Sequence, residues 1–447
     1  MPPIAPGWAV RLTDVLGAPP SELGEQHLQA LVENGVREDA DLDFKESRYG
    51  NSDQERRELA GDIAAMANDR GGLIVIGIRD ENDVAVEATP VELVDSEEGR
   101  LRQTTAGNLA PHVPFEIRVV QASEDPGRGY YLLIVPPSSL RPHAVRRARN
   151  LRYPRRDGTT TRWLSEAEVA DMYRDRFRLA TDQTEQMTGV LEEGLRAIDT
   201  SEGAFLVVGH VPTTSGSIAI DLARLQAVVL WASDFGLVHW WRGFFHQTPS
   251  ARAGARRIRV TTVFAADRPT TRPYAELHTN GCGFAGVPLF DARRRPGEGT
   301  GTWVLNEDLL LTVARTLHLL GRHASDNTGA WGDALVEAQV IGTELQLAYL
   351  DQWGISAEPI EGGRTLDGPL SSRHTLPLDA IAGRDQDLLT SARLVATDLF
   401  HAFGSPEVRQ IAADGKLRIR HIHGDHAELR RFAEERGVEI TEEVLTG

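Results

Sequence analysis

The sequence predicts an α+β protein with at least two domains, and three observations carry this prediction. Its 447 residues exceed the roughly 100–200 residues of one ordinary domain. Segments with helical spacing of apolar residues are interspersed with apolar runs typical of buried strands. The charge also changes along the chain, because residues 1–100 carry a net charge of −13 and residues 101–180 carry +6.

Composition excludes several classes of protein. The chain has 41% hydrophobic and 25% charged residues, which argues against disorder, collagen and coiled coil. A net charge of −17 means that nucleic acid could bind only through a local basic patch. Cys282 is the single cysteine, so a disulfide framework and a cysteine-rich zinc finger are excluded.

The N-terminal residues lack the features of a secretory signal, and no uncharged stretch reaches the ~18 residues of a membrane span. We therefore expect a cytoplasmic protein with no membrane partner. Of the 48 basic residues only Lys45 and Lys416 are lysines. Neither is followed by serine or threonine, which excludes a phosphate-binding Walker loop.

The first elements are predicted from local patterns. Asp41, Asp43 and Lys45 alternate with apolar residues, which predicts a short strand with its charged side chains on one face. A capping box at residues 52–55 opens a helix over about 53–68. The apolar run that follows, 73–78, predicts a strand buried on both faces.

Further strands are predicted at 115–121 and 130–136. A second capping box, at residues 165–168, opens a long helix that ends near 198, where we expect the domain boundary. The remainder predicts an α/β or α+β body. Its expected strands are 204–209, 257–264 and 416–422, and its expected helices lie near 218–232, 306–322, 332–341, 386–402 and 425–436.

Four segments in order resemble the Schlafen-type AlbA-like domain: 38–47 (EDADLDFKES), 67–72 (ANDRGG), 77–81 (GIRDE) and 152–161 (RYPRRDGTTT). The resemblance covers about residues 36–180 and implies a mixed sheet with helices. It gives the expected organisation of the chain. Residues 1–35 form a helical extension, 36–182 the nucleic-acid-binding domain, 183–200 a linker helix and 201–447 a C-terminal domain that regulates, forms homo-oligomers or recognises a partner.

The resemblance also implies a function and a site. Members of this family bind DNA or RNA, and some are metal-dependent endoribonucleases that cut tRNA or rRNA through three carboxylates. These map to Glu38, Asp43 and Asp80, with Glu81 as the alternative to Asp80; the family usually has glutamate in place of Asp43. Such oxygen ligands suit Mg²⁺ or Mn²⁺. Lys45 is then expected to contact the scissile phosphate.

An arginine run is the expected nucleic-acid-binding surface, because guanidinium groups pair with backbone phosphates. Tyr153 and Trp163 offer rings on which bases can stack. The arginines of the run are Arg141, Arg146, Arg147, Arg149, Arg152, Arg155, Arg156 and Arg162.

Two alternatives stay open beside the endonuclease hypothesis. The first is a regulator, of transcription or of defence, that binds DNA or RNA without cutting it. The second is a nucleotide-binding sensor or an interaction scaffold.

Overall fold

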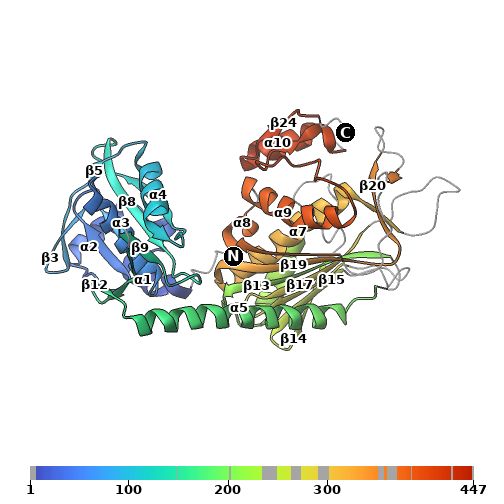
Figure 1. Cartoon of the computed structure of the whole chain (residues 1–447), viewed down its shortest axis with the longest axis horizontal. Coiled ribbons are helices and arrows are strands. Elements are labelled where there is room, and N and C mark those ends of the chain that lie inside the picture. The colour runs from blue at the N-terminus through green and yellow to red at the C-terminus, as the bar shows by residue number, and fades with distance from the viewer. Residues whose placement is uncertain are drawn as a thin grey trace. The chain divides into compact units, whose positions relative to one another are not determined.

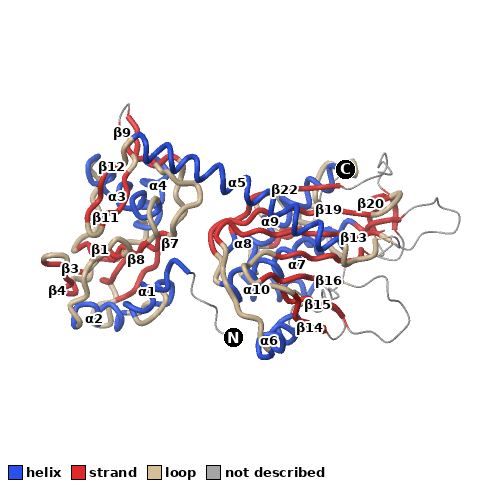
Figure 2. The backbone as a smooth tube through the Cα atoms, turned by 90° about the horizontal axis from the view of Figure 1, so that it is seen from below, coloured by secondary structure: helices blue, strands red, loops and turns tan. Residues whose placement is uncertain are grey.

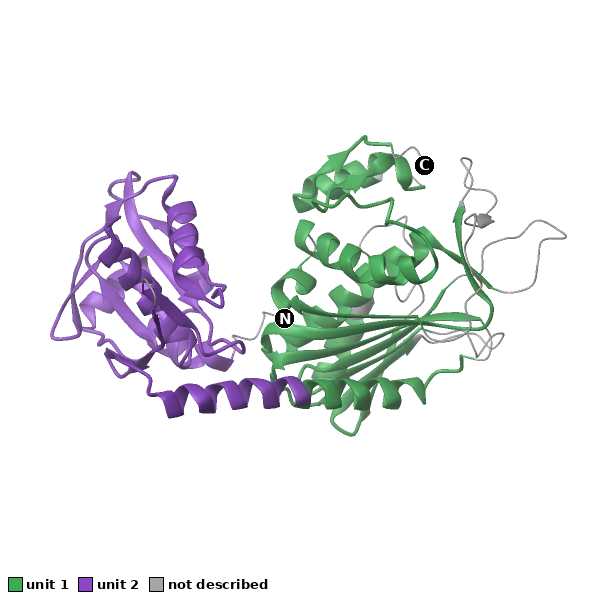
Figure 3. Cartoon of the chain, in the orientation of Figure 1, with its two compact units in different colours: residues 1–4, 182–447 green, residues 5–181 purple. Residues whose placement is uncertain are grey.

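The chain divides into two compact units, Ala5–Thr181 and Asp182–Gly447, which Figure 3 colours separately. We call them the N-terminal unit and the C-terminal unit. The computed structural model describes residues 7–147, 150–200, 203–233, 249–262, 273–289, 302–350, 357–359, 370–383, 385–423 and 426–444.

The N-terminal unit mixes helices and strands (Figure 1). Its helices are α1 (Val10–Leu16), α2 (Glu25–Glu33), α3 (Asp53–Ala67), α4 (Glu97–Asn108) and the first part of α5 (Glu166–Leu195). Its strands are β1 (Leu42–Lys45), β2 (Gly72–Ile76), β3 (Ile78–Glu81), β4 (Val84–Ala88), β5 (Val91–Glu92), β6 (Leu109–Ala110), β7 (Glu116–Gln121), β8 (Arg128–Val135), β9 (Ala144–Arg147), β10 (Asn150–Arg152), β11 (Pro154–Asp157) and β12 (Thr160–Trp163).

The central sheet of this unit is mixed, as predicted. Strand β1 runs parallel to β2, and β2 pairs antiparallel with β8, which also pairs with β7 and β5. Helices α3 and α4 cover one face through residues such as Ile63 and Leu101, and α1 and α2 cover the other through Leu12 and Leu28. Because both faces are covered, every residue of β2 is buried.

Asn68 fixes the end of α3. Its amide nitrogen donates to the carbonyl oxygens of His143 and Pro154, each at 2.8 Å, and its amide oxygen accepts from the His143 N–H at 2.7 Å. Gly71 follows with φ of +79°, and a Cβ there would lie 2.4 Å from Cδ of Pro137. The turn after α3 therefore needs glycine for both its backbone angle and its close packing.

The C-terminal unit contains the end of α5 and the helices α6 (Leu222–Ser233), α7 (Asn306–Arg322), α8 (Leu378–Ala382), α9 (Gln386–Ala402) and α10 (His426–Arg436). Its strands are β13 (Ala204–Thr214), β14 (Pro249–Gly254), β15 (Arg257–Thr262), β16 (Tyr274–His278), β17 (Gly283–Leu289), β18 (Thr302–Leu305), β19 (Trp331–Ile341), β20 (Leu345–Leu350), β21 (Ala357–Pro359), β22 (Leu370–Pro377), β23 (Leu417–Arg418) and β24 (Ile440–Thr441).

A seven-stranded antiparallel sheet organises the described part of this unit, in the order β14-β15-β16-β17-β13-β19-β22. Helices α7, α8 and α9 pack on one face, and the last turns of α5 pack on the other (Figures 1 and 2). On the α5 face, Met187 and Leu191 contact a small apolar cluster that includes Phe205 and Phe284. The apolar side chains of this last part of α5 thus belong to the core of the C-terminal unit.

Most predicted elements of the C-terminal unit are present, but the helix predicted near 332–341 is wrong. These residues form the interior strand β19, which pairs with β13 and β22. Ala334, Val336, Ala338 and Val340 alternate into the main core, so a period of two overrides the helical propensity of the alanine and glutamate residues. The strand predicted at 416–422 is shorter, because β23 ends at Arg418 and a 3₁₀ turn follows.

Candidate functional site

Three carboxylates converge at one edge of the N-terminal unit. One oxygen from each of Glu38, Asp80 and Asp83 lies within 4.8 Å of the others, and this is the one group of three or more possible metal ligands among the described residues. Glu38 precedes β1, Asp80 lies on β3, and Asp83 lies in the β3–β4 turn. We call these three residues the acidic cluster.

The β3–β4 turn brings Asp83 into the acidic cluster. Asn82 and Asp83 both have positive φ, 53° and 63°, as a tight two-residue hairpin turn requires. The carbonyl oxygen of Asp83 then accepts a hydrogen bond from the N–H of Glu38 at 2.7 Å. This bond holds the turn against the segment that carries Glu38.

Glu38 is held in an environment that disfavours its negative charge. Its carboxylate accepts a hydrogen bond from the N–H of Phe44 at 2.6 Å. Burial nevertheless raises the pKa of Glu38 to about 7, with further increases from the charges of Asp43 and Asp80 and opposing effects of the Phe44 N–H and of Lys45. A divalent cation would relieve this repulsion between carboxylates, and hard cations prefer such oxygen ligands. The cluster therefore fits Mg²⁺ or Mn²⁺.

Asp43 occupies a different position from the one that its place in the motif suggests. Its side chain is 3% exposed and pairs with Nζ of Lys45 at 2.6 Å and with Nη1 of Arg156 at 3.1 Å. It shares a sheet face with Ile74, below α3, and does not join the acidic cluster. The structure thus groups Asp83, rather than Asp43, with Glu38 and Asp80.

Lys45 lies between two carboxylates, at 2.6 Å from Asp43 and 3.9 Å from Asp62. Burial lowers the pKa of Lys45, but Asp43 and Asp62 together raise it above its ordinary value. Burial raises the pKa of Asp62 to about 6, and the Tyr49 hydroxyl donates to Asp62 at 2.8 Å. Lys45 is consequently a fixed positive charge beside Glu38.

Several arginines of the predicted binding surface form hydrogen bonds or ion pairs within the protein. Arg156 is buried, and besides Asp43 it donates to the carbonyl oxygen of Asp39 at 3.2 Å. Arg155 pairs with Asp69 at 2.9 Å, and Arg141 donates to the carbonyl oxygen of the same Asp69. These three guanidinium groups stabilise the domain, which leaves them poorly placed to contact phosphates.

Arg162 and Tyr153 are also held by side chains of α5. Arg162 makes a two-pronged ion pair with Glu168, with contacts of 2.6 and 3.1 Å. Burial raises the pKa of Tyr153 to about 12, and a hydrogen bond with Tyr173 adds to this effect. The Tyr153 ring is half-buried, so it offers little surface for stacking.

The remaining arginines form an exposed basic surface on the β9–β10 hairpin, which we call the basic hairpin. Arg146, Arg147 and Arg152 are exposed, and none pairs with a carboxylate among the described residues. The guanidinium carbons of Arg147 and Arg152 lie 4.8 and 5.8 Å from the centre of the Trp163 ring. Trp163 is itself 37% exposed. Arg149 lies outside the described residues.

The β11–β12 hairpin links the basic hairpin to the acidic cluster. At its turn, the Thr159 hydroxyl donates to the Asp83 carboxylate at 3.3 Å. At its open end, Trp163 stacks with the arginines of the basic hairpin. The four residue steps from Thr159 to Trp163 span about 13 Å of extended chain. The two candidate sites are therefore joined by one short hairpin.

Asp83 is the cluster residue that sequence reasoning missed. The signal was available, because the segment Asp80-Glu81-Asn82-Asp83 joins two strands, and Asn and Asp favour positive φ in such turns. A hairpin there places Asp83 back beside the first strand.

A family model described as Schlafen, AlbA_2 matches residues 38–164, which confirms the resemblance predicted from the motifs. This segment contains the acidic cluster, the β11–β12 hairpin and the basic hairpin. The family match indicates a function related to nucleic acid. A comparison with curated proteins found no match.

Two solved structures show local similarity at 19% identity. The first, the DIP2311 protein from Corynebacterium diphtheriae, matches over 33% of this chain and 27% of its own, with a TM-score of 0.23. The second is the N-terminal domain of an ATP-dependent DNA helicase RecG-related protein from Nitrosomonas europaea; it matches over 31% of this chain and 93% of its own, with a TM-score of 0.22. No helix among the described residues has the length and apolarity needed to cross a membrane.

Proposed function

We propose that the N-terminal unit binds RNA or DNA through the basic hairpin and cuts RNA with the acidic cluster and a divalent cation. One observation carries this proposal. The carboxylates of Glu38, Asp80 and Asp83 converge within 4.8 Å, and the β11–β12 hairpin joins this cluster to arginines that pair with no carboxylate among the described residues. An acidic protein that keeps such arginines exposed is expected to use them on an anionic partner.

Each residue has a separate role in the proposed reaction. Glu38, Asp80 and Asp83 would hold the cation, which, when bound, activates water and neutralises charge on the phosphate. Lys45 adds a fixed positive charge beside Glu38 and favours a phosphate there. Arg146, Arg147 and Arg152 contact the backbone, and Trp163 stacks on a base.

The test is cleavage of labelled tRNA, single-stranded RNA and duplex DNA by the full chain with Mg²⁺ or Mn²⁺. We expect RNA cleavage that falls at least tenfold in Glu38→Gln, Asp80→Asn and Asp83→Asn. Glu124→Gln, which changes an exposed carboxylate outside the cluster, should cut as the original chain does. Binding of Mn²⁺, followed by calorimetry, should weaken in the same three variants.

Asp43→Asn discriminates between the two ligand sets. If Mn²⁺ binding survives Asp83→Asn but is lost in Asp43→Asn, the ligands are those that the sequence motif suggests, and the role of Asp83 is refuted. The fold of each variant is checked by circular dichroism.

A non-catalytic regulator is the second candidate, and the ion pairs of Asp43 favour it. Lys45 and Arg156 neutralise this carboxylate, so it attracts a cation only weakly. Binding of RNA or DNA that depends on the basic hairpin, with no cleavage of any substrate with either metal, would support this reading and refute the nuclease.

A further inference from the structure

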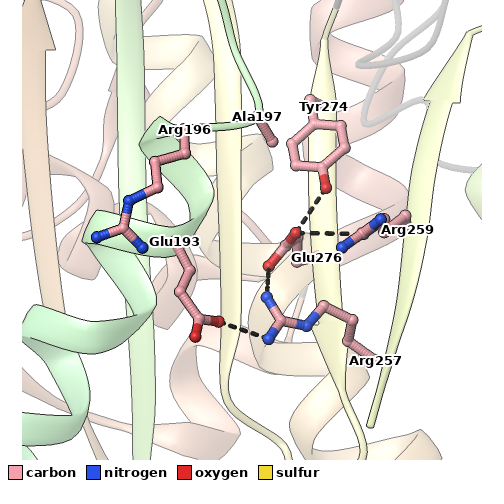
Figure 4. A pocket seen from close by; sticks show the side chains of 7 residues that line it. All are labelled: Glu193, Arg196, Ala197, Arg257, Arg259, Tyr274 and Glu276. Carbon is pink, nitrogen blue, oxygen red and sulfur yellow. Dashed lines mark hydrogen bonds and ion pairs between the residues drawn. The ribbon is translucent and has the colours of Figure 1, made fainter. Parts of the chain in front are cut away.

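The C-terminal unit contains a pocket of about 530 Å³ on the α5 face of its sheet (Figure 4). The last turn of α5 contributes Glu193, the residue after the helix is Arg196, β15 contributes Arg257 and Arg259, and β16 contributes Tyr274 and Glu276. The strand residues alternate with Ile258, Val260, Ala275 and Leu277, which face the main core. The polar side chains therefore lie together on one face by the period of the strands.

Glu276 forms the floor of the pocket. It is 2% exposed and accepts hydrogen bonds from the Tyr274 hydroxyl at 2.6 Å and from Nη1 of Arg257 at 2.5 Å. Burial alone would raise the pKa of Glu276, but hydrogen bonds from His278, Tyr274 and Arg257 lower it to about 2. Glu276 is therefore a permanent anion whose charge is satisfied from within the protein.

Arg257 is held by two carboxylates of the pocket. Its Nη1 pairs with Glu276, and its Nη2 pairs with Glu193 at 2.5 Å, so both terminal nitrogens already have carboxylate partners (Figure 4). Arg257 thereby neutralises the carboxylate that α5 contributes to the pocket. It organises the site and is not the group that a ligand would meet.

Arg259 and Arg252 have little or no ion pairing with carboxylates among the described residues. The ion pair of Arg259 with Glu276, from Nε, is long at 3.6 Å, and the Arg259 side chain is 54% exposed. Arg252 on β14 is the direct cross-strand partner of Arg259 and is also exposed. Like charges directly opposite on a sheet destabilise it. This arrangement, in a chain with a net charge of −17, favours an anionic ligand between them.

Arg196 supplies a third positive charge, from the α5 side of the pocket. It pairs with Glu192, one helical turn away, at 3.3 Å, and both side chains are more than half exposed. Exposed pairs of this kind are weak and are readily exchanged for a better partner. Arg196 and Arg259 thus stand on opposite walls of the pocket (Figure 4).

We propose that this pocket binds a small molecule with a phosphate monoester group. Guanidinium groups match phosphate oxygens in pairs, and a monoester carries nearly two charges at neutral pH, enough to engage Arg259 and Arg196 together. A volume of about 530 Å³ lies in the range of small-ligand sites. The ring of Tyr274, fixed by its hydroxyl bond to Glu276, provides a flat surface for the rest of the molecule.

A small ligand fits these observations better than a nucleic-acid strand. Arg196 and Arg259 line one concave site, whereas a strand needs cations spaced along a groove. Each phosphodiester also carries only one charge. This proposal concerns a site in the other unit and does not depend on the nuclease hypothesis.

The test is calorimetric titration of the full chain, at constant ionic strength, with 5′-AMP, ribose 5-phosphate and inorganic phosphate. We expect a phosphate probe to bind, and Arg259→Gln and Arg196→Gln each to weaken it at least tenfold. Arg174→Gln, an exposed arginine near the start of α5, should have no effect. Tighter binding of the two esters than of inorganic phosphate would support a monoester ligand, and tighter binding of 5′-AMP than of ribose 5-phosphate would identify a nucleotide.

Two results would overturn the proposal. One is no binding of any phosphate probe at millimolar concentration. The other is phosphate binding that Arg259→Gln and Arg196→Gln leave unchanged; if single-stranded RNA binding is lost in the same variants, the pocket belongs to the path of a nucleic acid. Both arginines are more than half exposed, so neither substitution should prevent folding.

Discussion

At the scale of single residues, Asn68 shows how one buried polar side chain determines the geometry of the N-terminal unit. It is completely buried and makes three hydrogen bonds to the backbone of two segments more than 70 positions away in sequence. These segments lead into β9 and β11, which carry the basic hairpin and Arg156. Asn68 therefore connects the end of α3 to the basic hairpin and to the strand that carries Arg156.

Asn68→Ala is expected to lower the free energy of unfolding of the N-terminal unit by about 3 kcal/mol, because it leaves buried N–H and C=O groups without partners. Native-state hydrogen exchange at the buried amides of β2 and β8 measures this change. Asn34→Ala, at the exposed end of α2, is the matched control and should cost less than about 0.5 kcal/mol. Equal effects of the two variants would mean that the Asn68 hydrogen bonds add nothing to stability.

The ion pair with Arg156 allows the structural role of Asp43 to be tested. Arg156→Met leaves Asp43 buried with Lys45 as its remaining ion-pair partner, and we expect a loss of about 3 kcal/mol in the free energy of unfolding. The double variant Asp43→Asn, Arg156→Met should lose less than the sum of the two single variants. Arg155→Met, next in sequence but partly exposed, should cost about 1 kcal/mol at most. Simple additivity would refute the Asp43–Arg156 coupling.

At the scale of elements, the β9–β10 and β11–β12 hairpins differ in whether their arginines pair with carboxylates of the protein. Arg147 and Arg152 lie on the same face of the hairpin and approach Trp163, whereas Arg146 alternates to the opposite face. The neighbouring β11–β12 hairpin turns its arginines inward, to Asp43 and Asp69. The two hairpins thus differ: one exposes its arginines, and the other pairs them with carboxylates of the protein.

The triple variant Arg146→Gln, Arg147→Gln, Arg152→Gln should reduce the salt dependence of binding to single-stranded RNA. For about three phosphate contacts, the slope of log K against log salt should decrease in magnitude by about 2. Fluorescence anisotropy at several salt concentrations measures this slope. The matched control carries Arg174→Gln and Arg178→Gln, on the exposed side of α5, and should keep the original slope. An unchanged slope in the triple variant would refute the assignment of the basic hairpin.

The sequence predicted these elements unequally well, for physical reasons. Helix α3 is encoded locally by the capping box of Ser52 and Glu55, and the helix begins where that signal lies. Strand β19 is not, because residues 331–341 favour a helix until β13 and β22 pair with them on both sides. Two members of the acidic cluster were predicted, but Asp83 depends on a turn and the pairing of Asp43 depends on Arg156, 113 positions later.

At the scale of the whole molecule, the two units differ in the kinds of titratable groups that they bury. In the C-terminal unit, burial lowers the pKa of His210 to about 3 and that of His323 to about 4. In the N-terminal unit, burial lowers the pKa of His143 to about 4, but it raises the pKa of Asp62 to about 6. The effect of acid on each unit therefore depends on whether its buried histidines or its buried carboxylates contribute more to the change in the free energy of unfolding.

These shifts predict that acid destabilises the C-terminal unit first. Between pH 6.5 and 4 its unfolded chain binds protons at His210 and His323 that the folded unit does not, so the free energy of unfolding falls as the pH falls, by up to about 1.4 kcal/mol per pH unit for each histidine. In the N-terminal unit Asp62 has the opposite sign, because its folded form holds a proton below pH 6 that the unfolded chain releases until about pH 4. This term offsets the loss from His143.

Hydrogen exchange of the full chain at pH 7, 6 and 5, corrected for the intrinsic exchange rates, tests this prediction. Protection in β13 and β17 should decrease with pH by more than protection in β2 and β8. His323→Gln removes one of the two protons while keeping a group that can bond the His278 carbonyl oxygen, and it should flatten the response of the C-terminal unit by about half. His112→Gln, which changes an exposed histidine, should leave both responses unchanged. A parallel loss of protection in both units would mean that other titrating groups, rather than these buried ones, control stability in acid.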